Sequence, residues 1–191
     1  MVGCGLGDDA EALAQQGFQV TAFDISPTAI AWCEKRFPDS QVKYQVADLF
    51  ALDPAWHHKF DFVFVLMQSL MGETTAIASG GDPQDRAASP RPRCIAECRN
   101  IQALPLKVRS TVMNAIASLV APGGTLLVIT RCRDSDTEPD GPPWPLSDTE
   151  LAYFQELGLQ EIHRDTVPES EDDPIQRLRI EYNREYTRHG S

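Results

Sequence analysis

Three glycines and an aspartate near the start of the chain have the types and spacing of a ligand-binding turn. Gly3, Gly5 and Gly7 occupy every second position, so the backbone there can turn sharply and approach a ligand closely. Asp24 follows about 20 positions later, at the end of the apolar segment 18–23. In such an arrangement, backbone N–H groups hold the polar middle of a ligand, and the carboxylate accepts hydrogen bonds from ribose hydroxyls. The pattern therefore predicts a nucleoside-binding site.

The glycine turn leads directly into a predicted helix. We expect Asp8 to cap its first turn, and Glu11, at the third helical position, to complete a capping box. The helical pattern ends at Gly17. Only Met1 and Val2 precede the glycines, whereas a buried strand has about five residues. We therefore expect a truncated first strand.

Strand-like and helix-like segments alternate along the rest of the chain. Ser26 with Pro27 predicts a helix start, and Ser147 with Glu150 predicts a second capping box. Further strands are predicted at residues 42–46, 60–65, 125–130, 160–167 and 175–182. Three further helices are predicted to stop at Pro38, Pro122 and Gly158. This order predicts an α/β fold with a doubly wound, mainly parallel sheet and a C-terminal antiparallel hairpin strand. Ligands of such sheets bind beyond the carboxyl ends of the strands.

One segment departs from this alternation. Residues 66–96 follow the strand at 60–65 and are mostly rich in Gly, Ala, Ser, Pro and Asp with little periodicity. We therefore predict a single domain over residues 1–191 that carries a flexible insert at 66–96.

Composition narrows the classes of partner. Lys and Arg number 17 against 28 Asp and Glu, so the formal net charge is −11, and we expect no nucleic-acid partner. No apolar run approaches the length of a membrane span, and no signal-peptide pattern follows Met1. The five cysteines are irregularly spaced, which favours a reducing compartment. We therefore expect a cytoplasmic protein without a membrane partner. The spacing of His57, His58 and the cysteines matches no zinc pattern, so we expect no metal.

Five signals in order resemble those of the class I S-adenosylmethionine-dependent methyltransferases. They are Val-Gly-Cys-Gly-Leu-Gly at 2–7, the acid Asp24 ending strand two, Ala47-Asp48 ending strand three, Phe60-Asp61-Phe62-Val63 as strand four, and Pro122-Gly123-Gly124 before strand five. The resemblance covers nearly the whole chain except residues 66–96, and it implies a Rossmann-like fold. Residues 142–147, Pro-Pro-Trp-Pro-Leu-Ser, also resemble the substrate-side loop of the thiopurine- and thiol-methylating branch.

The resemblance implies S-adenosyl-L-methionine as cofactor and a small-molecule methyl acceptor. The turn would contact the methionine and ribose part, Asp24 the ribose hydroxyls and Asp48 the adenine amino group. Leu49 or Phe50 would pack near the adenine face. The full implied cofactor set is Gly3, Cys4, Gly5, Gly7, Asp24, Ile25, Asp48 and Leu49. Cys98, Arg99, Asn100 and Trp144 fall where the family contacts its substrate. No general base stands out, and a soft nucleophile such as a thiolate would need none.

Two other functions stay open at this stage. A nicotinamide-dependent oxidoreductase also uses a glycine-rich turn, but such sites favour Gly-x-Gly-x-x-Gly over the Gly-x-Gly-x-Gly found here. An inactive or incomplete protein that keeps the fold is the second alternative, because the first strand is short and residues 66–96 interrupt the element that would approach the methyl group.

Overall fold

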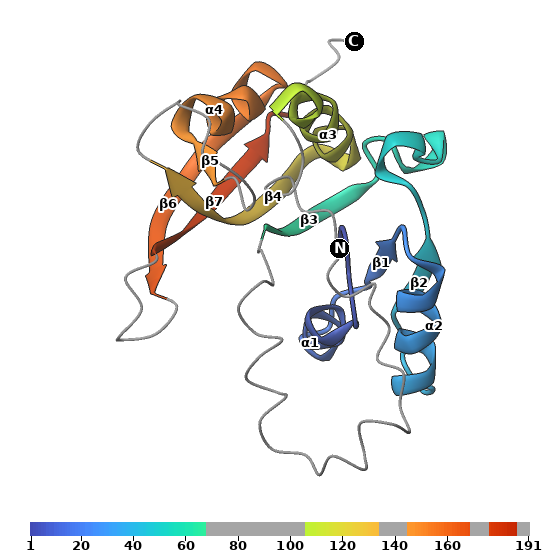
Figure 1. Cartoon of the computed structure of the whole chain (residues 1–191). Helices are drawn as coiled ribbons and strands as arrows, with labels where there is room; N and C mark the ends of the chain where they lie inside the picture. The colour runs from blue at the N-terminus through green and yellow to red at the C-terminus, as the bar shows by residue number, and fades with distance from the viewer. Residues whose placement is uncertain (68–105, 134–144, 169–175, 187–191) are drawn as a thin grey trace.

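The structure is a computed structural model that describes residues 1–67, 106–133, 145–168 and 176–186 (Figure 1). Its longer helices are α1 (Asp8–Gln15), α2 (Pro27–Arg36), α3 (Leu106–Leu119) and α4 (Asp148–Glu156), and two short 3₁₀ helices are η1 (Leu49–Ala51) and η2 (Pro54–Trp56). The strands are β1 (Thr21–Asp24), β2 (Lys43–Val46), β3 (Phe60–Met67), β4 (Val120–Arg133), β5 (Leu146–Ser147), β6 (Leu159–Pro168) and β7 (Gln176–Arg184).

Val2 joins two groups of strands into one sheet. It forms parallel bridges to Phe23 of β1 and to Val65 of β3, so the order across the sheet is β2, β1, Val2, β3, β4, β7, β6. The first strand predicted before the glycine turn is thus the single position of Val2 between β1 and β3. Neighbours from β2 to β4 run parallel, whereas β7 is antiparallel to both β4 and β6. The predicted C-terminal hairpin is confirmed, and it makes the sheet mixed.

Helices cover both faces of this sheet. Figure 1 shows α1 and α2 on one side of the strands and α3 and α4 on the other. This is the doubly wound arrangement that the alternation of elements predicted. Its carboxyl ends carry the segments that follow β1 and β2, where a ligand of such a sheet would lie.

Two separate apolar cores hold these layers together. The large core lies around β3, β4, β7, α3 and α4, with Phe154 and Tyr182 fully buried at a ring distance of 5.2 Å. The small core lies under the glycine turn, between α1, α2 and β1, and its buried members are Cys4, Ala10, Val20, Ala22, Ile30, Cys33 and Val42. The glycine turn therefore rests on the smaller of the two cores.

Two of the three predicted helix caps are confirmed. The Ser26 side chain accepts a hydrogen bond from Ala29 N at the start of α2. Ser147 and Glu150 form the complete capping box at the start of α4.

The predicted capping box at α1 is wrong. Gly7, in the left-handed conformation with φ of 88°, takes the N-cap position without a side-chain cap, and Asp8 is already helical. Glu11 accepts hydrogen bonds from Tyr44 and from Ser40 instead. Its carboxylate therefore ties α1 to β2 and to the turn before it.

Strand β3 extends to Met67, two positions beyond the predicted end at residue 65. Leu66 and Met67, the first residues of the predicted insert, belong to this strand, and the rest of that segment lies outside the described residues. Strand β4 is longer than predicted as well, because it includes residues 120–124 and runs to Arg133. Among the residues that the structure describes, no helix has the length and apolar character needed to cross a membrane.

Candidate functional site

The glycine turn has a backbone conformation that side chains would oppose. Gly3, Gly5 and Gly7 all have positive φ, at 65°, 52° and 88°. A methyl group added at Gly3 would meet no atom within 4 Å, whereas one at Gly7 would lie 2.6 Å from the Tyr44 hydroxyl. The turn is thus open beside Gly3 and closely backed at Gly7.

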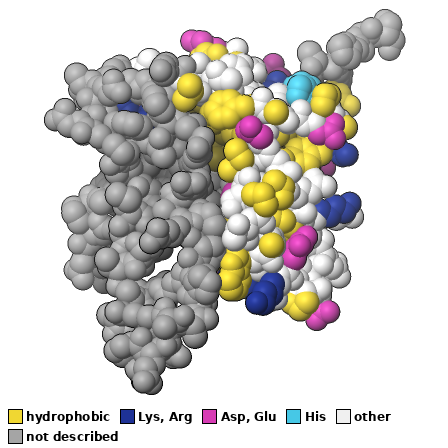
Figure 2. Space-filling model, turned by 45° about the vertical axis from the view of Figure 1, so that its right-hand side comes forward, with side chains coloured by type: hydrophobic (Ala, Val, Ile, Leu, Met, Phe, Trp, Pro, Cys, Tyr) yellow, Lys and Arg dark blue, Asp and Glu magenta, His cyan; other side chains and the backbone are white. Residues whose placement is uncertain are grey.

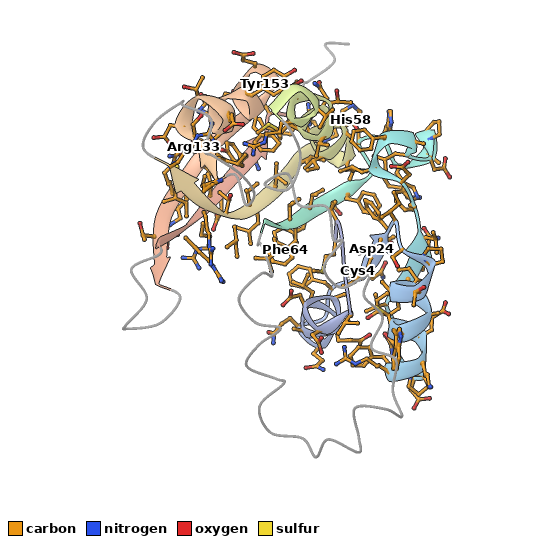
Figure 3. The ribbon with its side chains drawn as sticks, viewed as in Figure 1. Cys4, Asp24, His58, Phe64, Arg133 and Tyr153 are labelled. Carbon is orange, nitrogen blue, oxygen red and sulfur yellow. The ribbon has the colours of Figure 1, made fainter. Side chains whose placement is uncertain are left out.

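Asp24 connects this turn to the next helix. Its carboxylate is buried, with the residue 3% exposed, and accepts hydrogen bonds from Gly5 N at 3.1 Å and from Ser26 N at 3.0 Å. Cys4 N donates to Phe23 O at 3.0 Å, which anchors the turn alongside the end of β1. Figure 3 shows Cys4 and Asp24 close together at the end of β1. The predicted pairing of the turn with the acid therefore exists as a direct contact.

Side chains from α2 and β2 line the back of the turn. Cys33 Sγ donates to Gly5 O at 3.2 Å, and Arg36 Nη1 donates to Leu6 O at 2.8 Å. Arg36 also forms a two-pronged ion pair with Asp8, at 2.7 and 3.0 Å. These contacts hold the turn from the side opposite its open face.

The two thiols and the phenol behind the turn stay neutral. Burial, with Cys33 and Asp24 nearby, raises the pKa of the Cys4 thiol, and burial also raises that of Cys33. The pKa of the Tyr44 hydroxyl is raised by burial and by its hydrogen bond to Glu11. Cys4 and Cys33 are free thiols. At neutral pH these groups are therefore hydrogen-bond donors and packing elements rather than nucleophiles.

Asp48 lies two positions beyond the end of β2, the strand that pairs with β1. Asp24 pairs in register with Val46, and Ala47 N donates to Asp24 O at 3.0 Å. The Asp48 side chain accepts from Phe50 N at 2.9 Å and so caps η1. Both predicted carboxylates thus lie at the carboxyl edge of the sheet.

Large apolar side chains are exposed around these two carboxylates. Ile25 is 45% exposed, Val46 53% and Phe50 49%. In the view of Figure 2, hydrophobic side chains on the described surface alternate with single charged ones. Exposed apolar side chains beside buried or capped carboxylates suit a flat ring whose edge carries polar groups.

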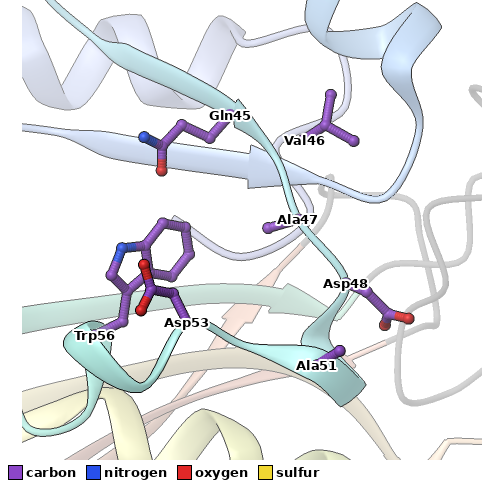
Figure 4. A pocket seen from close by; sticks show the side chains of 7 residues that line it. All are labelled: Gln45, Val46, Ala47, Asp48, Ala51, Asp53 and Trp56. Carbon is purple, nitrogen blue, oxygen red and sulfur yellow. The ribbon is translucent and has the colours of Figure 1, made fainter.

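A hollow of about 550 Å³ lies beside β2 (Figure 4). Trp56 forms one wall and packs against Phe23 at a ring distance of 5.2 Å and against Phe60 at 6.0 Å. The residues that line the hollow are Gln45, Val46, Ala47, Asp48, Ala51, Asp53 and Trp56. In Figure 4 the Gln45, Asp53 and Trp56 side chains gather on one side of β2, whereas Asp48 points away from them. Val46 and Ala47 line this hollow and also pair with Asp24, so the hollow reaches the edge that carries Asp24.

Sequence reasoning missed a cluster of charges near the carboxyl end of β4. Glu150 pairs with Arg109 at 2.5 Å and with Arg133 at 2.9 Å, and the Arg109 and Arg133 side chains are 3% and 11% exposed. Arg133 also donates to Pro145 O. The sequence pointed to Glu150 only as part of the capping box. Its ion pairs with Arg109 and Arg133 depend on segments that come together only in the folded protein.

The predicted cofactor residues lie together, while the predicted substrate residues lie outside the described part. The cofactor residues belong to the turn, to the end of β1 or to the start of η1 just after β2: Gly3, Cys4, Gly5, Gly7, Asp24, Ile25, Asp48 and Leu49. Cys98, Arg99, Asn100 and Trp144 fall in residues that the structure does not describe. Within the described ranges, no group of three or more His, Cys, Asp or Glu side chains is arranged to hold a metal ion.

Comparison with known proteins gives one sequence match and many structural ones. Residues 1–78 match the family model of a methyltransferase domain. No protein of curated function matches the chain in sequence. The matched part contains the glycine turn, Asp24 and Asp48.

Solved structures share the fold over almost the whole chain. The 1,6-didemethyltoxoflavin-N1-methyltransferase of Burkholderia thailandensis, bound to 1,6-didemethyltoxoflavin and S-adenosylhomocysteine, is 17% identical with a TM-score of 0.60. The match covers 96% of this chain and 69% of that one. The N-methyltransferase NodS of Bradyrhizobium japonicum WM9, in complex with S-adenosylhomocysteine, is 17% identical with a TM-score of 0.62, covering 96% and 75%.

A third similar structure has a different activity in its name. The [4+2]-cyclase SpnF is 12% identical with a TM-score of 0.66, and the match covers 96% of this chain and 74% of that one. At these identities the likeness concerns the fold. Residues 1–78 carry the sequence pattern of a methyltransferase domain, and the chain has the fold of the class I S-adenosylmethionine-dependent methyltransferases.

Proposed function

We propose that the protein is an S-adenosylmethionine-dependent methyltransferase that transfers a methyl group to a small-molecule acceptor. The observation that carries the proposal is the direct hydrogen bond from Gly5 N to Asp24 in a turn whose sequence matches a methyltransferase domain. That contact brings the two parts of a nucleoside site, backbone donors and a carboxylate, within one hydrogen bond of each other.

The cofactor would lie across the carboxyl ends of β1 and β2. The backbone of Gly3, Cys4, Gly5 and Gly7 would contact its methionine and ribose part. Support comes from the open space beside Gly3, where an added methyl group would meet nothing within 4 Å. A ligand can therefore approach this backbone closely.

Asp24 would accept hydrogen bonds from the two ribose hydroxyls. Each carboxylate oxygen has more than one lone pair, so a carboxylate that holds Gly5 N and Ser26 N can accept further bonds. Ile25, 45% exposed, and Leu49 would cover the faces of adenine, and Asp48 would accept from its amino group. The residues present therefore fit a nucleoside.

The bound cofactor would supply a methyl group on a positively charged sulfur, which a nucleophile displaces in line. For such a step the protein mainly positions two reactants and excludes water. The formal net charge of −11 repels polyanionic acceptors, which favours a small molecule. A thiol or another soft nucleophile would need no strong base from the protein. The substrate side would include Cys98, Arg99, Asn100 and Trp144.

Calorimetric titration with S-adenosylmethionine, S-adenosylhomocysteine and NADH tests this proposal. Both adenosyl compounds should bind and NADH should not, because the turn has Gly-x-Gly-x-Gly spacing. A screen of small thiols, amines and hydroxyl compounds with radiolabelled cofactor then identifies the acceptor. Binding of NADH alone would establish the oxidoreductase alternative instead.

A second candidate is a protein that keeps the fold and the cofactor site without methyl transfer. It is favoured by the likeness to SpnF, which is named as a [4+2]-cyclase and has a TM-score of 0.66. S-Adenosylhomocysteine binding without turnover of any acceptor in the screen would support this reading. Labelled product from any single acceptor would exclude it.

A further inference from the structure

Successive carbonyl groups of the glycine turn are held from behind by side chains of one helix. Gly5 O accepts from Cys33 Sγ at 3.2 Å, and Leu6 O accepts from Arg36 Nη1 at 2.8 Å. Both donors lie on α2, and both bonds join segments separated by about 30 positions in the chain. The backbone of the turn is therefore hydrogen-bonded on one side by residues that are distant in the sequence.

These bonds orient the backbone donors of the turn. In a planar trans peptide the carbonyl of one residue and the N–H of the next point in opposite directions. When Cys33 and Arg36 hold the carbonyls of Gly5 and Leu6, the peptide planes of this glycine-rich segment cannot rotate freely. Glycine otherwise permits such rotation more readily than any other residue.

Tyr44 supports the same turn by packing. Its hydroxyl lies 2.7 Å from Glu11 Oε1 and 3.4 Å from Gly7 O. A hydroxyl has one proton, so the shorter bond to Glu11 takes it. The ring and its oxygen then close the space behind Gly7, where an added methyl group would lie 2.6 Å away.

The hydrogen bonds of Arg36 are the strongest of those that hold the turn, because its side chain is charged and binds two partners. Besides Leu6 O, it holds Asp8 at the first position of α1 in a two-pronged pair. The Arg36 side chain is 34% exposed and that of Asp8 65% exposed, so the ion pair adds little to folding. Its geometric effect on the turn is the larger consequence.

We infer that Arg36 is a positioning residue that, together with Tyr44, fixes the Gly3–Gly7 turn in its ligand-binding conformation. This inference rests on the proposed function for the identity of the ligand, but not for the order of the turn. Arg36 touches no ligand itself and acts through Leu6 and Asp8.

The experiment compares S-adenosylhomocysteine affinity and thermal stability in four variants. Arg36→Ala should weaken binding roughly tenfold, the loss expected for one charge-assisted hydrogen bond. Arg36→Lys keeps a cation on a single donor nitrogen, so it should restore part of the affinity. Tyr44→Phe keeps the ring and should weaken binding less than Arg36→Ala.

Arg164→Ala is the matched control. Arg164 has a similar exposure, 31%, and pairs with Asp148 and Glu161, on the part of the sheet that carries α4 and β6. Its loss should lower the melting temperature about as much as Arg36→Ala while leaving the affinity unchanged. Equal affinity in wild type and Arg36→Ala, or an equal loss in Arg164→Ala, would overturn the inference.

Amide hydrogen exchange of the ligand-free proteins gives a readout that needs no cofactor. A peptide covering residues 1–10 should exchange faster in Arg36→Ala than in wild type, and at the wild-type rate in Arg164→Ala. Unchanged exchange in Arg36→Ala would refute the positioning role. A wild-type protein that binds neither adenosyl compound would instead refute the proposed function, so the two failures are distinguishable.

Discussion

Asp24 has a structural role and a proposed binding role at once. It is 3% exposed and accepts from Gly5 N and Ser26 N, so it joins the glycine turn to the start of α2. A buried carboxylate that accepts backbone N–H bonds costs free energy when it is removed, because those donors lose their partner. Binding and stability must therefore be measured separately at this residue.

Asp24→Ala should reduce S-adenosylhomocysteine affinity by about 2–3 kcal/mol, because a charge-assisted contact to the ribose is lost. It should also lower the free energy of unfolding by about 1–3 kcal/mol. Isothermal calorimetry and urea unfolding measure the two effects. The control is Ser147→Ala, which removes a side-chain bond to a backbone N–H, that of Glu150, far from the turn and should leave the affinity unchanged. Unchanged affinity in Asp24→Ala would exclude the ribose contact.

Alanine substitutions at Gly3 and Gly7 distinguish the cost of backbone strain from the cost of a steric clash. Both have positive φ, but an added methyl group would meet nothing at Gly3 and would lie 2.6 Å from the Tyr44 hydroxyl at Gly7. Gly3→Ala should cost about 1–2 kcal/mol of stability, from strain alone. Gly7→Ala should cost more, and Tyr44→Phe in the same chain should recover part of the difference. Equal losses at both glycines in urea unfolding would show that Tyr44 does not restrict Gly7.

At the scale of elements, helix caps formed by neighbouring residues could be predicted from the sequence. Hydrogen bonds to distant segments, which can replace such a cap, could not. The caps Ser26 and Ser147 follow from the residues nearest to them, and both form as predicted. Glu11 has the same local pattern, but Tyr44 and Ser40 take its carboxylate, and Gly7 begins the helix instead. A capping box is therefore overridden when partners on another strand are within reach.

The residues of the candidate site that would face the ligand could be predicted from the sequence, whereas the residue that supports the turn from behind could not. The glycines and Asp24 form a spaced motif, so sequence alone brings them together. Arg36 lies in the last turn of α2, where a cation is expected for helix-dipole reasons alone. Nothing in the local pattern distinguishes that role from its bonds to Leu6 and Asp8.

Glu150 should matter more to α4 than the cap residue Ser147 does. Ser147→Ala removes one cap and should cost about 1 kcal/mol of unfolding free energy. Glu150→Ala also leaves Arg109, whose side chain is 3% exposed, without this carboxylate and should cost about 3–5 kcal/mol. Urea unfolding of both variants measures the difference. Glu156→Ala, at the exposed end of the same helix, is the control, and a Glu150→Ala loss as small as that of Ser147→Ala would contradict a buried ion-pair role.

At the scale of the whole molecule, the single-domain prediction leads to a deletion experiment. Strand β3 ends at Met67, so the segment to remove is 68–96. Its composition of small and polar residues cannot bury enough apolar area to offset ordering, and loop closure depends only weakly on length. The deleted protein should keep cooperative thermal unfolding and its far-ultraviolet circular dichroism. Loss of the cooperative transition would mean that this segment contributes to the core.

The single position of Val2 between β1 and β3 has a consequence for how the molecule melts. The small core lies on the β1 side of Val2 and the large core mainly on the β3 side, so the two halves of the sheet need not unfold as one unit. The glycine turn lies on the small core, whereas Leu49 packs against the large one, so a cofactor that contacts both would join the two parts. In scanning calorimetry, the ligand-free protein should have a van't Hoff enthalpy below its calorimetric enthalpy. Saturating S-adenosylhomocysteine should bring the two enthalpies together, whereas equal enthalpies without ligand would show that Val2 already couples the halves fully.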